Sequence, residues 1–350
     1  MNRKRLEQLL VKIAKVKLIV MGDYFLDYYL IIDRSLSEVS LETGLEAYQV
    51  IETRKSPGAA GTVVANLRAL GASVQAIGLV GDDGNGYDLL KRLKEMQVNC
   101  NGLIEVAGYH TPTYMKPMIR EADGSEHEIN RMDIKSRTET SDSLQSAIIK
   151  MMNNYLPQVD GMLVVDQVQE HNCGVITDRV RGALKEIAAR YPHKVIGVDS
   201  REYLSLFEGV MLKSNVKEAG KAAAVDCSVE EDILKAAERC GCALTKKTGK
   251  PVVITLSEHG LFVIENEKSA GVHLPAIKVE GPIDVVGAGD SVSAAIGAAL
   301  CAGATLTEAA ILGNLCASIV IQQLGTTGTA SPQQLLDQFD SHPEVPYFEK

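Results

Sequence analysis

The sequence lacks several features that define other classes of protein. No apolar run reaches the roughly 20 residues of a membrane span. Charges interrupt residues 6–17, so we expect neither a membrane segment nor an export signal. No basic cluster extends beyond Arg3-Lys4-Arg5, and the net charge of −9 argues against a nucleic-acid partner. Only Cys240 and Cys242 of the scattered cysteines lie close together, which excludes a paired zinc site and predicts buried free thiols. We therefore expect a cytoplasmic protein.

Apolar runs and helical patterns alternate along most of the chain. Strands are predicted at residues 17–23, 74–80, 162–165, 195–198, 210–212, 252–255 and 261–264. Helices are predicted at residues 63–70, 87–97, 175–191, 230–243 and 291–301. This alternation predicts an α/β, Rossmann-like fold with a central, mostly parallel sheet flanked by helices. Because no composition break or internal repeat appears, we expect a single domain over residues 1–350.

Two segments interrupt this alternation. Residues 28–52 and 113–132 alternate aromatic or β-branched residues with polar ones, which predicts short extended strands. We expect them to form a small sheet over the mouth of the active site, as a lid that excludes water or pairs two subunits in a homodimer. Surface hairpins without a function are the alternative.

The stretch Gly287-Ala288-Gly289-Asp290 opens the small-residue helix predicted at 291–301. Its glycines allow successive N–H groups to converge at the positive end of the helix dipole, which predicts a site for a phosphate or a developing oxyanion. Asp290 would lie beside that anion, an unfavourable place for a carboxylate unless it takes a proton from an attacking hydroxyl. A glycine-rich turn with a helix-starting Asp is the alternative.

Carboxylates and small residues mark a second candidate site. Asp23 and Asp27 follow the first strand, where open α/β sheets place ligands, and their oxygens suit the hydroxyls of a polyol. A local backbone cap is the alternative for Asp27. The small residues of 56–62 would let a substrate approach the backbone closely.

Five ordered motifs resemble those of the ribokinase-like (PfkB) carbohydrate kinases, over about residues 16–329. Asp284–Asp290 is similar to D-T-x-G-A-G-D with Val285 as the one departure, and Asn215-Val-Lys-Glu218 matches N-x-x-E. Thr255–Gly260 resembles T-L-G-x-x-G, with Ser257 in place of the first glycine. The remaining two motifs are the helix entry near Pro57 and Asn314 followed by Gly325-Thr326.

The resemblance implies ATP-dependent phosphorylation of a hydroxyl on a sugar or sugar phosphate. Asp290 would be the general base, the amides of Gly287, Ala288 and Gly289 would stabilise the transferring phosphoryl, and Asn215 and Glu218 would hold Mg²⁺ through water. The other nucleotide residues implied are Thr255, Ser257, Gly260 and, near the adenine, Asn314. The residues implied for K⁺ are Asp284, Val286, Val320, Gln323 and Gly325. The residues implied for the sugar are Asp23, Asp27, Gly58, Thr62 and Asp166. Lys116 could reach a substrate phosphate from the lid, and a solvated lysine is the alternative.

Within the family, the chain looks most like the D-glycero-β-D-manno-heptose 7-phosphate kinases. The stretches that carry this likeness are 22–27, 57–72, 80–83, 111–116 and 130–133. Three departures all fall on the sugar side. Thr62 replaces an expected Asn, 41–46 replaces a proline-rich segment, and Gln167-Val-Gln-Glu170 replaces Tyr-Gly-Lys-Gly, which removes a lysine suited to a substrate phosphate.

Two other functions remain open from the sequence. A nucleoside kinase would need an aromatic stacking wall, which Tyr24 or Phe25 could supply, whereas the carboxylate pair Asp23 and Asp27 favours a polyol. A sugar-binding or regulatory protein without turnover would account for the substituted positions. The intact Asp290 argues against that alternative.

Overall fold

The computed structural model describes residues 1–121, 123–227 and 232–348. Within these ranges a sheet of nine strands forms the centre of the molecule, and its strands are parallel except for the antiparallel pairs β12–β13 and β13–β14. Their spatial order is β14 (Val272–Leu274), β13 (Leu261–Ile264), β12 (Val252–Thr255), β11 (Met211–Asn215), β10 (Val195–Ser200), β9 (Gly161–Asp166), β1 (Lys17–Gly22), β4 (Ser73–Gly81) and β5 (Asn99–Val106).

Helices cover both faces of this sheet because its central strands are apolar on both sides. In β1, Leu18 and Val20 join one buried cluster, whereas Ile19 and Met21 join the other, as the alternation of side chains along a strand requires. The first cluster includes residues of α1 (Arg3–Ile13), α2 (Ala60–Ala69), α3 (Gly84–Glu95), α8 (Ala288–Cys301), α9 (Leu306–Val320) and α10 (Pro332–Ser341). The second includes residues of α4 (Asp142–Tyr155), α5 (Asp178–Arg190), α6 (Val216–Ala223) and α7 (Ile233–Thr248).

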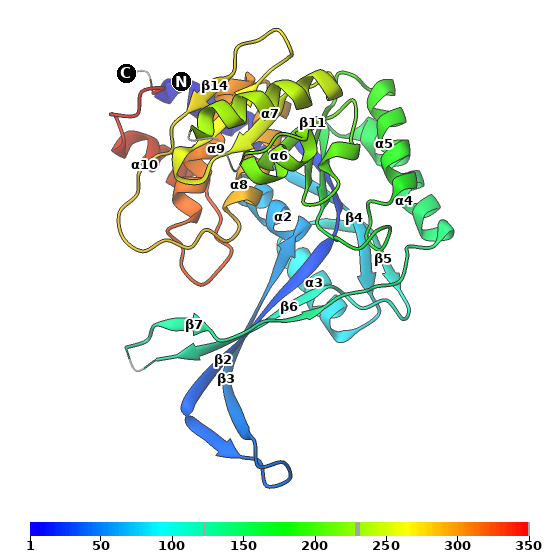
Figure 1. The fold of residues 1–350 in the computed structure, drawn as a ribbon, viewed down its shortest axis with the longest axis vertical. Coiled ribbons are helices and arrows are strands. Elements are labelled where there is room, and N and C mark those ends of the chain that lie inside the picture. The colour runs from blue at the N-terminus through cyan, green and yellow to red at the C-terminus, as the bar shows by residue number, and fades with distance from the viewer. Residues whose placement is uncertain (122, 228–231, 349–350) are drawn as a thin grey trace.

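The two predicted insertions pair with each other in a second sheet, which Figure 1 shows projecting from the body as an arm. Its strands are β2 (Tyr24–Val39), β3 (Glu46–Ala59), β6 (Thr113–Arg120), β7 (Glu126–Glu128) and β8 (Met132–Ile134). We call these five strands the arm. β2 and β3 form a long antiparallel ribbon, and β6 lies parallel to β2.

The predicted α/β architecture is confirmed, although some helix ends differ and several helices were not predicted. The predicted helix at 175–191 begins only at Asp178, because the Thr177 side chain caps the first turn by accepting the Val180 N–H. The predicted helix at 230–243 corresponds to α7, and its first two residues lie outside the described residues. Helices α1, α4, α6, α9 and α10 had no predicted counterpart. In the part of the chain that the structure describes, no helix is long and apolar enough to cross a membrane.

Helix α8 lies close to the sheet because it has glycine where the two meet. A Cβ at Gly297 would lie only 2.7 Å from Leu163 Cδ2, and that leucine is buried in β9. Helix α8, which the glycine-rich turn leads into, is therefore packed directly against the sheet.

We expect Gly297→Val to lower the free energy of unfolding by about 1–3 kcal/mol, since the added atoms must displace Leu163. Urea denaturation measures the change. The control is Gly182→Ala in α5, where an added Cβ meets nothing within 4 Å and should stabilise the helix by about 0.5–1 kcal/mol. Equal stability of Gly297→Val and the unaltered protein would contradict this close packing.

Candidate functional site

The register of the parallel strands brings polar residues from distant parts of the sequence to one edge of the sheet. Asp166 of β9 is opposite Ser200 of β10, and Asp199 of β10 is opposite Lys213 of β11. Since parallel strands end at the same edge, these side chains form a row at the carboxyl ends of the strands, where α/β sheets place ligands.

The turn before α8 has the geometry of an anion site. Gly287 is the N-cap of α8 with φ +81°, and no side chain caps this helix, so its first amides are not occupied by a capping side chain. The Ala288 N–H donates to Val285 O at 3.2 Å, so one of the three predicted amides is used inside the turn. Thr62 of α2 lies beside the turn, because a Cβ at Gly287 would be 3.4 Å from Thr62 Cγ2.

A buried ion pair lies next to this turn. Lys213 Nζ donates to Asp199 Oδ2 at 2.7 Å, and Ser293 Oγ of α8 donates to the same oxygen at 3.1 Å. The ammonium also lies against the first turn of α8, since a Cβ at Gly289 would be 2.9 Å from Nζ. A fixed cation thus stands beside the backbone of the glycine-rich turn.

Asp290 lies in the same first turn and is surrounded by charged groups. Burial raises the pKa of its carboxyl to about 7, with the Asp199 charge acting in the same direction and Lys213 opposing it. A carboxyl with a pKa near neutrality suits a group that must accept a proton during a reaction and release it afterwards.

On the nucleotide side, Asn215 and Glu218 form a capping box at the start of α6. The Asn215 N–H donates to Glu218 Oε2 and the Glu218 N–H donates to Asn215 Oδ1, both at 2.9 Å. Burial raises the pKa of Glu218, while the bond from Asn215 opposes that rise. In the ranges described, no three His, Cys, Asp or Glu side chains could hold one metal ion directly. Asn215 and Glu218 carry oxygen atoms, the ligand type that Mg²⁺ prefers, and this ion usually keeps several of its waters.

The next predicted nucleotide residues follow β12. Thr255 is opposite Asn215 in the sheet, so the two predicted positions are adjacent. Ser257, at the position where the resembling motif has glycine, adopts φ +53°, a strained backbone for a residue with a Cβ. Gly260 has φ +91°, and a Cβ there would be 2.1 Å from Leu274 O, so only glycine fits.

Asn314 is buried in α9, and its amide nitrogen is engaged by the protein. Nδ2 donates to Leu274 O at 3.2 Å, to Pro275 O at 3.1 Å and to the Tyr347 hydroxyl at 3.2 Å. These contacts fix the loop that follows β14 against α9. Asn314 therefore holds this loop in place through its amide nitrogen.

The five residues predicted for a monovalent cation are brought together by two loops. The Asp284 carboxylate accepts the Val286 N–H at 3.0 Å and the Gly325 N–H at 3.3 Å, and its own N–H donates to Ile321 O. Val320 O accepts the Gln323 N–H in the same turn. The carbonyl-rich loops of the predicted K⁺ site are therefore adjacent.

The sugar-side residues Asp27 and Lys116 pair with each other in the arm. Lys116 Nζ lies 3.1 Å from Asp27 Oδ1 and 3.2 Å from the Tyr29 hydroxyl, and all three side chains are buried. A Cβ at Gly58 would lie 2.6 Å from Asp27 Oδ2, so glycine leaves that oxygen its space. Asp27 also contributes to the raised pKa of Asp290, which places the two carboxyls within electrostatic range.

Asp23 holds a loop in place through main-chain contacts. Its Oδ2 accepts the N–H groups of Gln167 and Val168 at 2.8 and 2.9 Å, and its Oδ1 accepts that of Val175 at 2.8 Å. Burial raises the pKa of Asp23, and the three amide bonds oppose that rise. This carboxylate is therefore turned toward the protein, and it organises residues 167–175.

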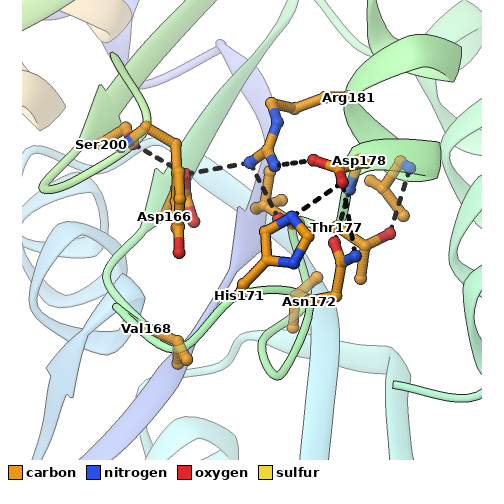
Figure 2. Close-up of polar contacts among 12 residues, drawn as sticks. Asp166, Val168, His171, Asn172, Thr177, Asp178, Arg181 and Ser200 are labelled. Carbon is orange, nitrogen blue, oxygen red and sulfur yellow. Dashed lines mark hydrogen bonds and ion pairs between the residues drawn. The ribbon is translucent and has the colours of Figure 1, made fainter. Parts of the chain in front are cut away.

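Asp166 is buried where that loop begins, and a polar network continues from it (Figure 2). Arg181 lies between two carboxylates, with Nη1 3.6 Å from Asp166 Oδ2 and Nη2 2.6 Å from Asp178 Oδ1. Ser200 Oγ donates to Asp166 at 2.7 Å, and His171 Nε2 lies 2.9 Å from Asp178. Burial raises the pKa of Asp166 to about 8, and the Asp23 charge acts in the same direction.

The structure adds residues to the site that had no predicted role. Asp199, Lys213 and Ser293 stand beside Asp290, and Arg181 stands beside Asp166. Asp199 and Lys213 each follow a predicted strand. Charged residues at the ends of successive parallel strands could therefore have pointed to these two positions. Ser293 lies one turn after Asp290 on α8, and only the packing of that helix shows its contact.

Comparisons with known proteins agree with this arrangement. The model of the pfkB family carbohydrate kinases matches residues 27–334. The bifunctional protein HldE of a Nitratiruptor species is 31% identical over 323 residues, which cover 92% of this chain and 64% of that protein. HldE of Desulfatibacillum aliphaticivorans is 31% identical over 337 residues, 94% of this chain and 64% of that protein. The chain thus spans less than two thirds of these relatives.

Solved structures show the same fold. Arabidopsis thaliana ribokinase, complexed with ribose and ATP, superposes with a TM-score of 0.66 at 18% identity, over 93% of this chain and 98% of that one. Phosphofructokinase-2 from Escherichia coli, with substrates and products, has a TM-score of 0.67 at 18% identity, over 93% and 99% of the two chains. The ribokinase-like fold is therefore confirmed.

We expect Asp23→Ala to release residues 167–175, because three amides lose their acceptor at a cost of about 1–3 kcal/mol for each one left unsatisfied. Hydrogen exchange would show loss of protection at Gln167, Val168 and Val175. The control is Asp33→Ala, whose carboxylate accepts only from nearby Ser35, at an irregular part of β2, among the contacts described. Unchanged protection in Asp23→Ala would refute the anchoring role.

Proposed function

Because the chain belongs to the pfkB family of carbohydrate kinases, which use ATP, we propose that it transfers the γ-phosphate of ATP to a hydroxyl of a sugar or sugar phosphate, with Asp290 as general base. The observation that carries this proposal is the position of Asp290 in the first turn of α8, beside the Gly287 turn and with a pKa near 7. A deprotonated Asp290 accepts the proton of the attacking hydroxyl as the phosphoryl group arrives.

Electrostatic positioning supplies the rest of the proposed catalysis. The amides of Gly287 and Gly289 would donate to the phosphoryl group, and Ala288 keeps the turn closed through its bond to Val285. Lys213 adds a fixed positive charge at this position, held there by Asp199 and Ser293. Preorganised donors of this kind stabilise the charge of a transferring phosphoryl group without reorganising during the reaction.

The cations belong to the same proposal. Asn215 and Glu218 would hold Mg²⁺ through waters, and Mg²⁺ when bound supplies neutralisation of the phosphate charge. The loops of Asp284 and Gly325 would hold K⁺ by their carbonyls. Thr255, Ser257 and Gly260 would border the nucleotide. Asn314 would fix the loop after β14 near the adenine.

The acceptor side favours a polyol over a nucleoside. Asp27, Gly58 and Thr62 would contact the sugar, with Lys116 holding Asp27 in position. Tyr24 is 1% exposed, and its hydroxyl donates to Val20 O, so it lies in the core and offers no stacking wall to a nucleobase. Because the sequence resembles the heptose 7-phosphate kinases, heptose 7-phosphate is the first acceptor to test.

The experiment that tests this proposal is ADP release with Mg·ATP over a panel of sugars, sugar phosphates and nucleosides, with and without K⁺. We expect Asp290→Asn to lower kcat by about 10²–10⁴-fold, the usual contribution of a general base, while ATP affinity stays nearly unchanged. The matched control is Asp337→Asn, an exposed position on α10. Substantial turnover by Asp290→Asn would remove this residue from the base role. Intact ATP binding with no turnover of any acceptor would favour a binding or regulatory protein.

The pH dependence gives a further test of the same residue. The base acts when deprotonated, so kcat should fall as pH drops below about 7, the pKa of Asp290. Lys213→Met removes a charge that lowers this pKa and should move the acid limb of the pH profile to higher pH. An acid limb that stays in place in Lys213→Met would contradict the coupling of the two groups.

We also propose that the arm pairs two copies of the chain. The outer part of the β2–β3 ribbon exposes large apolar side chains that a second arm would cover, namely Leu36, Val39, Leu41, Leu45, Tyr48, Val50 and Ile51. An exposed ribbon with this much apolar surface is suited to sheet-on-sheet contact between subunits.

We expect Val39→Glu combined with Leu45→Glu to convert a dimer to a monomer, since each buried carboxylate would lack a partner. Light scattering after size-exclusion chromatography measures the mass. Val11→Glu on α1, an equally exposed valine on the body at 63% exposure, is the control. If the unaltered protein is a monomer, the proposal that the arm pairs two copies is wrong.

A further inference from the structure

A small cavity lies between the base of the arm and the loop that Asp23 anchors. Its lining residues are Phe25, Tyr109, Pro112, Lys135, Ser136, Gln167, Val168 and Glu170. Its volume is about 10 Å³, enough for one water molecule or one hydroxyl or amine group. Three of the lining residues belong to the segment 167–170, where the sequence departs from the heptose kinases.

Glu170 gives the cavity a specific chemical preference. Its Oε1 lies 3.4 Å from Lys135 Nζ, whereas its Oε2 is buried and, in the described structure, has no hydrogen-bond partner. A buried carboxylate oxygen without a donor costs about 1–3 kcal/mol or more, so this site favours any group that brings an N–H or O–H. Water or a ligand hydroxyl would satisfy it.

Phe25 lines the cavity and also lies beside the proposed sugar site. Phe25 and Asp27 point to the same face of β2, because side chains two apart on a strand share a face. Both approach Gly58, since a Cβ there would be 2.6 Å from Asp27 Oδ2 and 3.5 Å from Phe25 Cβ. If an acceptor bound between Asp290 and Asp27 extends along this face of β2 past Phe25, its other end lies at the cavity that Glu170 lines.

The charges around the cavity disfavour a phosphate. Asp23 lies behind the loop and contributes to the raised pKa of Tyr109, and Asp166 lies beyond it, already paired with Arg181. Lys135 is the cation in the lining, and Glu170 pairs with it. A phosphate dianion here would have to separate that pair and leave the Glu170 carboxylate facing a like charge.

We propose that Glu170 accepts a hydrogen bond from a hydroxyl or amine at the end of the acceptor remote from Asp290, so that the acceptor is unphosphorylated at that end. This inference rests on the proposed kinase function. Glu170 is a specificity-determining residue, and the backbone contacts of Asp23 set its position by fixing the segment from which it projects (Figure 2 shows the neighbouring network at Asp166 and Arg181).

The test compares sugars with and without a terminal phosphate, in the full chain with Mg²⁺ and a non-hydrolysable ATP analogue. The pairs are ribose and ribose 5-phosphate, fructose and fructose 6-phosphate, and heptose and heptose 7-phosphate. Calorimetry measures Kd for each, and ADP release with ATP measures kcat/KM. The unaltered protein should bind the best free sugar at least about tenfold more tightly than its phosphate, as expected for one hydrogen bond to a charged group.

Two substitutions and a control sharpen the result. Glu170→Gln should weaken free-sugar binding by about fivefold to tenfold, and Glu170→Lys, which puts a second cation beside Lys135, should reverse the preference toward the phosphorylated partner. KM for ATP should stay unchanged in both. Glu265→Lys, at an exposed position just after β13, controls for the added charge and should keep the preference of the unaltered protein.

The outcomes separate the two proposals. Tighter binding of phosphorylated sugars by the unaltered protein would overturn the inference, as would a failure of every sugar to bind. An unchanged preference in Glu170→Lys would show that the cavity holds a resident water only. Selective binding of free sugars with no ADP release would uphold the assignment of Glu170 and overturn the kinase function.

Discussion

The row of polar residues at the carboxyl ends of the parallel strands is the constraint on which the site depends. The central strands are buried on both faces, so their apolar residues fix the register, and the register in turn fixes which residues meet at the edge. Asp199 and Lys213 come from adjacent strands and pair because those strands do. Helix α8, held close by Gly297, then places its first turn against this row.

Charge balance explains how so many carboxylates occupy one edge. Lys213 compensates Asp199, Arg181 compensates Asp166, and Lys116 compensates Asp27. Removing one member of a buried pair leaves an uncompensated charge, which costs several kcal/mol. Asp290 has Lys213 only as a neighbour that Asp199 already holds, and burial together with the Asp199 charge raises its pKa to about 7.

The fold could be predicted from the alternation of strands and helices and from the order of the motifs. The Asp290 turn and the Asn215–Glu218 pair could be predicted because each lies within a few consecutive residues. Contacts between distant segments were not accessible in this way. Asp23 suggested a sugar ligand by its place after a strand, yet its partners lie more than 140 residues away and are backbone amides, which leave no trace in residue types. Asn314 likewise bonds carbonyls about 40 residues away. Ser257 matched a glycine position, and only the backbone reveals that it accepts the left-handed conformation that glycine would take at little cost.

The way in which Asp23 holds the loop has a consequence for how this protein can change over generations. The three bonds reach main-chain N–H groups, which every residue except proline provides. Substitutions at Gln167 or Val168 can therefore alter the lining of a pocket without altering the path of the chain that carries them. A segment fixed by its backbone is free to vary its side chains, and a new substrate preference can arise there by single substitutions while the fold and the phosphate chemistry stay as they are.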